Sequence, residues 1–275
     1  MDRRLTPSNG RVAHVSLQGQ VLAKRYTEGD QARIAVPLTD LLSEPDGARV
    51  RQLVMGDHLL VLEIRDDFAF VQSQKDGYCG YVAASALGPA RPVTHWVSAP
   101  ATHLYSAPDL KSPEQSALSI GAHLCLTATD HPRFAETIDG LYVPHVHVRA
   151  IGDWATDPVS VAESLLGTPY LWGGNSRGGL DCSGLVQAAL LACGIPCPGD
   201  SGLQEDAVGV PVPEGAAHRR GDLFFWRGHV AMAAGAGRLI HASGHHMAVV
   251  YEPIADALAR IAAQGDGGLR VVKRI

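Results

Sequence analysis

The chain has 275 residues, which is too long for one small domain and typical of two or three. Hydrophobic residues make up 46% of it, enough for a core in each domain. The net charge of -5, with both signs interspersed, argues against a nucleic acid, an anionic membrane or a polyanionic substrate as partner.

The first thirty residues are polar and irregular, and they predict an N-terminal arm over residues 1–30 or a short helix within it. Polar side chains interrupt every apolar run there, so the pattern is not typical of a secretory signal. No stretch approaches the roughly 18 apolar residues that a membrane helix needs. The five cysteines are odd in number and scattered, as expected for reduced thiols. We therefore expect a cytoplasmic protein without a membrane partner.

Residues 31–150 contain two diverged copies of one β-rich pattern. Each copy has short alternating runs such as Leu59–Ile64, separated by Pro and Gly turns at hairpin spacing, and almost no helical periodicity. We predict two small all-β barrels of roughly 60 residues each, over 31–89 and 90–150. The matching segments, first copy before second, are Leu42–Asp46 and Tyr105–Asp109, Met55–His58 and Ile120–His123, and Asp76–Val82 and Asp139–Val143.

Residues 151–275 change to a pattern of helices followed by strands. Asp157 as N-cap and Pro158 after it predict a short helix that ends at Gly167. A second helix starts after Asp181 and stops at Gly194. This order predicts an α+β domain. Its later elements are an antiparallel sheet of Asp222–Trp226, Val230–Ala234 and Arg238–His241, then a helix at Ile254–Gln264 and a last strand at Leu269–Val272.

Cys182 occupies the first turn of this second helix. The helix dipole and the free first-turn N–H groups favour a thiolate there. A lone cysteine in an apolar helix is more often a small core residue, and Cys125 and Cys193 fit that alternative. Cys182 differs, because Ser-Gly follows it and two histidines, His229 and His241, stand at the edges of strand-like runs downstream. Nucleophile, base and orienting group thus occur in chain order.

Residues 155–253 carry five motifs, T-P-Y-L-W-G-G, D-C-S-G-L-V, R-R-G-D-L-F-F-W, G-H-V-A-M and H-A-S, and in this order they resemble the NlpC/P60 family of papain-like cysteine peptidases. The resemblance implies Cys182 as nucleophile, His229 as general base and His241 as the group that orients His229. It also implies that the Tyr170 hydroxyl and the Cys182 backbone N–H hold the oxyanion. Family members cut amide bonds in bacterial cell-wall peptides, typically between γ-D-glutamate and a diamino acid.

The two predicted barrels resemble bacterial SH3 domains, and their position ahead of an NlpC/P60 domain resembles the cytoplasmic murein-peptide recycling enzymes. These are γ-D-glutamyl-L-diamino acid endopeptidases of the dipeptidyl-peptidase VI type. The resemblance implies hydrolysis of free L-Ala-γ-D-Glu-diaminopimelate or -Lys peptides. It also implies that the first barrel closes the site beyond the L-alanine, so that only a free N-terminus is accepted.

Such a substrate carries an ammonium group and a free α-carboxylate near the bond that is cut. A glutamate in a surface turn is as often a solvated side chain, and this alternative applies to Glu44. The residues expected to contact the substrate are Glu44, with Tyr78 beside it, for the ammonium, Asp181 as a second acceptor, Ser183 and Ser201 for the carboxylate, and Trp172 as a wall of the cleft.

Thirteen histidines raise the possibility of a metal site. No acidic or cysteine pair stands at zinc spacing beside them, so we predict neither a metal nor a cofactor. Asp222 is better interpreted as a turn residue than as a catalytic acid. The residue pairs with ligand chemistry are His145 and His147, His245 and His246, His241 and His245, and Cys193 and Cys197.

Two other functions compete with the peptidase hypothesis. A cell-wall-binding or scaffolding protein would use the barrels alone, and we would then expect a secretory signal and a degraded triad. A thioester-forming acyltransferase or amidase would use the same nucleophile, because groups other than water can capture a thioester. The sequence leaves open the oligomeric state and which diamino acid follows the D-Glu.

Overall fold

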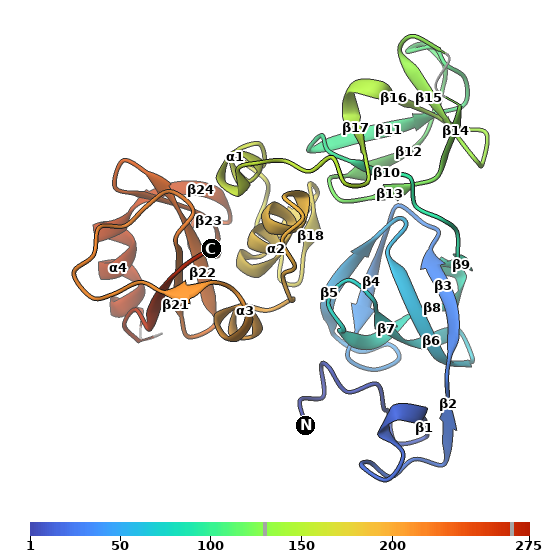
Figure 1. Cartoon of the computed structure of the whole chain (residues 1–275), viewed down its shortest axis with the longest axis horizontal. Coiled ribbons are helices and arrows are strands. Elements are labelled where there is room, and N and C mark those ends of the chain that lie inside the picture. The colour runs from blue at the N-terminus through green and yellow to red at the C-terminus, as the bar shows by residue number, and fades with distance from the viewer. Residues whose placement is uncertain (129–130, 265–266) are drawn as a thin grey trace. The chain divides into compact units, whose positions relative to one another are not determined.

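The computed structural model describes residues 1–128, 131–264 and 267–275. The chain divides into two compact units, Met1–Ile151 and Gly152–Ile275 (Figure 1). The first unit is built from strands with short 3₁₀ turns, and the second combines helices with a sheet. Among the described helices, none has both the length and the apolar composition needed to cross a membrane.

A seven-stranded antiparallel sheet, here called the first barrel, follows the N-terminal residues. The alternation predicted at Leu59–Ile64 holds for Leu59 to Val61 and is then interrupted, because Leu62 is also buried and the pairing of β6 with β7 is irregular between Val61 and Glu63. The strand order is β5-β4-β8-β7-β6-β3-β9. The strands are β3 Asp30–Ile34, β4 Leu38–Leu42, β5 Arg49–Val54, β6 His58–Arg65, β7 Phe68–Ser73, β8 Cys79–Ala83 and β9 Leu87–Pro89.

The N-terminal residues are more regular than their polar sequence predicts. Strand β1, Val12–His14, pairs in parallel with β2, Arg25–Thr27, and a 3₁₀ turn links them. Val12 is fully buried in one cluster with core residues of the first barrel. The Arg11 guanidinium lies 2.7 Å from a carboxylate oxygen of Glu63 in β6. These contacts anchor the N-terminal segment to the first barrel.

A second β region follows over residues 95–150. It contains a five-stranded sheet, β12-β11-β16-β15-β14, and a three-stranded sheet, β13-β10-β17, both antiparallel. Its classification as a bacterial SH3 domain stays a prediction. The strands are β10 His95–Val97, β11 Ala101–Tyr105, β12 Glu114–Ser119, β13 His123–Leu124, β14 Leu126–Ala128, β15 Phe134–Thr137, β16 Tyr142–Pro144 and β17 Val148–Ala150.

The second unit is built around a six-stranded antiparallel sheet with the order β20-β25-β21-β22-β23-β24. Helix α4 packs on it through Ala257 and Ile261, which share a core with Phe224 and Trp226, and α2 packs on β22 and β23 (Figure 1). The elements are α1 Pro158–Glu163, β18 Asn175–Ser176, β19 Gly179–Leu180, α2 Cys182–Ala192, α3 Ser201–Ala207, β20 Val210–Pro211, β21 Leu223–Trp226, β22 His229–Gly235, β23 Arg238–Ser243, β24 Ala248–Pro253, α4 Ile254–Ala263 and β25 Val271–Arg274.

The predicted fold class, a multidomain chain with N-terminal β domains ahead of an α+β peptidase fold, is confirmed. Helix α1 is shorter than predicted and ends at Glu163, with turns continuing to Gly167. Its N-cap is as predicted, because the Asp157 carboxylate accepts the Val159 N–H at 2.9 Å. Gly194 has the positive φ of 70° that the stop of α2 requires.

Candidate active site

Cys182 is the first residue of α2, and the residues around it fix the helix N-terminus. One carboxylate oxygen of Asp181 accepts the Gly184 N–H at 2.6 Å, and the other accepts the Gly173 N–H at 2.9 Å. A Cβ on Gly184 would lie 2.4 Å from the Gly174 carbonyl oxygen, so only glycine fits there. The D-C-S-G sequence therefore holds the thiol at a defined point of the first helical turn.

The environment of the Cys182 thiol disfavours its ionisation. The residue is only 7% exposed, and the S–H group points to the Gly228 carbonyl oxygen at 3.9 Å. Burial, and secondarily the Asp181 charge, raise the pKa of Cys182 to about 12. Backbone N–H groups, including those of Val230 and Ser183, act in the opposite direction. The expected thiolate-stabilising effect of the helix start is present, but burial outweighs it, so the resting Cys182 side chain is a thiol.

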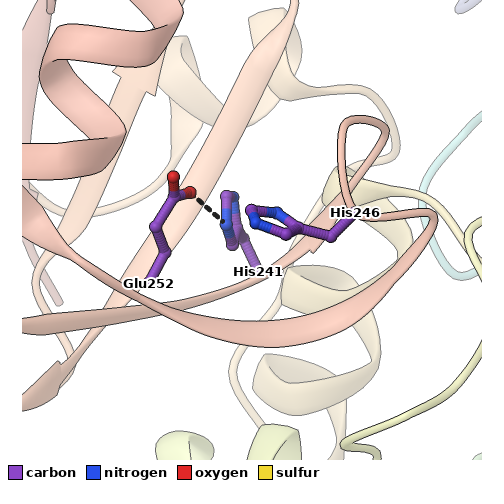
Figure 2. Close-up of side chains that lie close together, drawn as sticks. All are labelled: His241, His246 and Glu252. Atoms are coloured by element: carbon purple, nitrogen blue, oxygen red, sulfur yellow. Dashed lines mark ion pairs between the residues drawn. The ribbon is translucent and has the colours of Figure 1, made fainter.

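A line of polar groups runs across strands β22, β23 and β24. His229 Nε2 lies 2.9 Å from His241 Nδ1. His241 Nε2 lies 3.0 Å from a carboxylate oxygen of Glu252, as Figure 2 shows. Arg260 of α4 binds both oxygens of that carboxylate, at 2.7 and 2.8 Å. The antiparallel register of the three strands brings these side chains together although they are far apart in sequence.

Both histidines are neutral at neutral pH. Burial, and then the charges of His241 and Arg260, lower the pKa of His229 to about 3. Burial also lowers the pKa of His241 to about 4, although the Glu252 carboxylate acts against this shift. Arg260 lowers the pKa of Glu252, so that this group is ionised. The line thus consists of two neutral imidazoles that end on a charged carboxylate.

The Glu252 carboxylate selects the tautomers of both imidazoles. His241 Nε2 has no hydrogen-bond partner of good geometry among the described residues, but a negative oxygen 3.0 Å away still favours a proton on that nitrogen, which leaves His241 Nδ1 as an acceptor. His229 must then donate its Nε2 proton to His241, since the two nitrogens are 2.9 Å apart. The nitrogen of His229 left without a proton is Nδ1. Gly228 and Val230, the neighbours of His229 in the chain, both contact the thiol, and the role of His229 as the base that takes its proton stays a prediction.

Tyr170 keeps its proton. Burial, and then the charges of Cys182 and Asp181, raise the pKa of its hydroxyl to about 12. The ring lies in van der Waals range of the Cβ position of Gly244, just after β23. A hydroxyl that stays protonated is a permanent hydrogen-bond donor, which suits the predicted oxyanion role. That role, like those of Cys182, His229 and His241, stays a prediction for the experiments below.

The other predicted contact residues of this unit are mainly structural in the observed geometry. The Ser183 hydroxyl donates to Asp181 at 2.9 Å, so its proton supports the helix cap. Ser201 begins α3 and is buried, and the nearby Gln204 amide donates to the Ser183 carbonyl at 2.9 Å, which ties α3 to α2. Trp172 is 71% exposed. Their substrate contacts stay predictions.

Glu44 and Tyr78 lie in the first unit. Glu44 is exposed in the turn between β4 and β5, as expected for either a solvated or a ligand-binding carboxylate. Tyr78 is 4% exposed, and the Arg51 guanidinium lies over its ring at 5.7 Å from the centroid. Their predicted contact with the substrate ammonium stays a prediction. Asp222 caps a turn and binds Arg274 at 2.7 Å, so its turn assignment is confirmed.

Sequence reasoning missed Glu252 and Arg260. The signal was a lone acid in the apolar strand run Ala248–Pro253, followed eight residues later by an arginine on a helix. His246, considered from the sequence only as a ligand together with His245, has its donor atom within 4.8 Å of those of His241 and Glu252 (Figure 2). These three groups have ligand chemistry, but Arg260 already neutralises the carboxylate that a cation would need. We therefore assign Glu252 to the orientation of His241.

Glu252→Gln should lower kcat about 10- to 100-fold with little change in KM, because the tautomer of His241 is no longer fixed. Ring ¹⁵N NMR reports the tautomer directly and should show the His241 proton redistributing from Nε2 toward Nδ1. Glu205→Gln serves as the control. Glu205 lies on α3 and, like Glu252, forms an ion pair with an arginine, Arg270. Unchanged kcat and ring signals in Glu252→Gln would contradict the orienting role.

Known proteins share sequence with both units of the chain. The NlpC/P60 family matches residues 167–260, and the bacterial dipeptidyl-peptidase Sh3 domain matches residues 41–87. The chain is 30% identical over 217 residues to the gamma-D-glutamyl-L-lysine dipeptidyl-peptidase of Bacillus subtilis (strain 168), which covers 69% of this chain and 71% of that protein. It is 42% identical over 87 residues to dipeptidyl-peptidase 6 of Lysinibacillus sphaericus, or 31% of each chain.

A solved structure shares the fold over most of the chain. The crystal structure of an NlpC/P60 family protein from Bacillus cereus ATCC 10987 superposes with a TM-score of 0.74 at 22% identity, covering 89% of this chain and 99% of that one. The similarity to the Bacillus subtilis relative extends over 69% of the chain, and the matched NlpC/P60 domain lies in the second unit. The chain therefore belongs to the NlpC/P60 family and is a cysteine peptidase.

Proposed function

We propose that this peptidase hydrolyses the γ-D-glutamyl-diamino acid bond of free murein peptides, L-Ala-γ-D-Glu-diaminopimelate or -Lys, in cell-wall recycling. The observation that carries the proposal is the combination of an NlpC/P60 domain with a segment matching the bacterial dipeptidyl-peptidase Sh3 domain. The relatives named as dipeptidyl-peptidases support it. All five cysteines are free thiols, which supports a reducing, cytoplasmic location.

The reaction starts with Cys182 as a neutral thiol and His229 as a neutral imidazole. As Cys182 Sγ attacks the γ-glutamyl carbonyl, its proton passes to His229 Nδ1, and the Tyr170 hydroxyl and the Cys182 N–H receive the developing oxyanion. The new imidazolium is stabilised through His241 by the Glu252 charge. The imidazolium then donates its proton to the departing amine. Water then hydrolyses the thioester, with His229 as base.

The proposal is tested by incubating the full chain with L-Ala-γ-D-Glu-diaminopimelate, its N-acetylated form and purified sacculi. We expect L-Ala-γ-D-Glu to be released from the free peptide only. Efficient release of peptides from sacculi would contradict a recycling role. Added amines distinguish hydrolysis from acyl transfer, because a transferase would yield the amide of L-Ala-γ-D-Glu with the added amine.

Glu44→Gln should lower kcat/KM for the free peptide about 30- to 1000-fold, mainly through KM, because a charge-assisted pair with the substrate ammonium is lost. The acetylated peptide should stay a poor substrate of the variant, since the predicted steric limit remains. Glu114→Gln, at an exposed glutamate of β12, is the matched control. A Glu44→Gln enzyme equal to wild type would remove Glu44 from the substrate site and leave the catalytic assignment intact.

A further inference from the structure

A cleft of about 450 Å³ lies within the first unit, where the first barrel meets the second β region. Its charged lining consists of Arg33, Arg91 and Asp139. This volume falls in the range of sites that hold small organic molecules. Most of the lining is apolar and comes from both β regions, including Pro37, Met55, Leu104, Leu124, Ile138 and Leu141.

The walls of this cleft are held in place by direct contacts. The His123 N–H donates to the Met55 carbonyl at 2.8 Å. Val54 of the first barrel belongs to the hydrophobic core of the second β region. Gly56 has a φ of 83°, and a Cβ there would lie 2.3 Å from the His123 carbonyl oxygen, so the approach requires glycine. The cleft is therefore preformed, and a ligand entering it does not have to order its walls.

The cleft carries more positive than negative charge. Arg91 binds one Asp139 oxygen at 2.5 Å, whereas Arg33 reaches the other at only 3.8 Å. The remaining contacts of Arg33 are weak: one terminal nitrogen donates to the Ile34 carbonyl at 3.3 Å, and its buried Nε has no hydrogen-bond partner among the described residues. The guanidinium groups of Arg33 and Arg91 thus share the one carboxylate of Asp139. The buried Arg33 Nε–H has no acceptor in the described part of the chain, which is an unfavourable state for a buried donor.

The titratable groups next to the cleft do not neutralise the excess positive charge of Arg33 and Arg91. Asp57 is fully engaged with Lys75 at 2.6 Å and with the Val54 N–H at 2.9 Å. Burial lowers the pKa of His123, which therefore stays neutral. Burial, and then the neighbouring Arg91, also lower the pKa of Arg33, as expected for a guanidinium that lacks a full counter-charge.

We propose that this cleft is a binding site for a small carboxylate with an apolar body, separate from the catalytic site. The carboxylate lies between the guanidinium groups of Arg33 and Arg91, because guanidinium and carboxylate groups form paired, charge-assisted hydrogen bonds. The apolar body packs against the side chains of the two β regions. A single excess positive charge and a mostly apolar lining favour a monocarboxylate over a phosphate or a polyanion.

The test uses N-acetyl-leucine as probe and N-acetyl-leucinamide as its uncharged match. With the ¹⁵N-labelled full chain, N-acetyl-leucine should shift the Arg33 Nε–H signal and the amides of Met55 and His123. The amide probe should bind at least tenfold more weakly, since one charge-assisted contact contributes about tenfold or more. Equal binding of the two probes, or shifts confined to residues 152–275, would overturn the proposal.

Three variants separate the cleft from general charge effects. Arg33→Met should weaken N-acetyl-leucine binding at least tenfold, and Arg133→Met, at an exposed arginine outside the cleft, should not. Asp139→Asn should strengthen binding, because it frees both guanidinium groups from their competing carboxylate. If Arg33→Met does not fold, Arg91→Met replaces it. Unchanged binding in the arginine variants, or weaker binding in Asp139→Asn, would contradict the site.

Discussion

Cys182→Ala lowers kcat by at least about 10⁴-fold while the fold is retained, because the variant has no group that can form the thioester. The lost sulfur makes a 3.9 Å contact with a carbonyl oxygen and weak contacts with backbone N–H groups, and the cap that positions the helix belongs to Asp181. Steady-state release of L-Ala-γ-D-Glu measures the loss, and circular dichroism with thermal unfolding measures the fold.

Cys193→Ala is the matched control, because Cys193 is the residue that follows the same helix and its thiol pKa is also raised by burial. It should turn over substrate like the wild type. Mass spectrometry of a quenched wild-type reaction should find the acyl group on the peptide that contains Cys182. An acyl group on another cysteine, or measurable turnover by Cys182→Ala, would exclude the assignment.

His229→Ala should lower kcat about 10³- to 10⁴-fold, and His241→Ala should lower it less, by about 10- to 100-fold. The difference follows from the order His229, His241, Glu252 in the site. In the proposed mechanism His229 takes up and releases the proton of the reaction, whereas His241 and Glu252 fix the tautomer of His229. Rate measurements on saturating free peptide check the order. Equal losses, or the larger loss at position 241, would mean that the two roles are reversed.

The same histidines make stability depend on pH. Their folded-state pKa values, about 3 for His229 and about 4 for His241, lie below the unfolded value of 6.5. Between these limits the unfolded state binds protons that the folded state does not, so the free energy of unfolding falls as pH decreases below about 6.5. Denaturant unfolding at pH 7 and at pH 5 measures this effect. The decrease in the free energy of unfolding from pH 7 to pH 5 should be smaller in His241→Gln than in the wild type.

The sequence predicted well those elements whose signals are local. Asp181 and Gly194 delimit α2 because capping and left-handed stops depend on a few neighbouring residues. The strands that carry His229 and His241 were predicted from their apolar runs, and their antiparallel pairing is confirmed. The motifs also predicted Cys182, His229 and His241 as the catalytic residues, and the structure brings the two histidines within 2.9 Å of each other.

The features that escaped prediction depend on pairing between distant segments. Glu252 joins the site because β24 pairs with β23 in a register that no local pattern specifies. The burial of the thiol depends on how β22 packs against α2, so its raised pKa could not be derived from the helix start alone. The N-terminal strand pair β1 and β2 was missed for a similar reason, since Val12 is buried only by side chains of the first barrel.

The raised pKa of Cys182 has a consequence for how the enzyme survives between turnovers. Peroxide and soft electrophiles react with thiolates far faster than with thiols, and further oxidation to sulfinic acid is irreversible in most proteins. A thiol 7% exposed, with a pKa near 12, offers such reagents little reactive sulfur until a substrate is in place. The same property makes small, unselective alkylating agents poor inhibitors, so an effective covalent inhibitor must be shaped like the peptide and bring its electrophile to the carbonyl position.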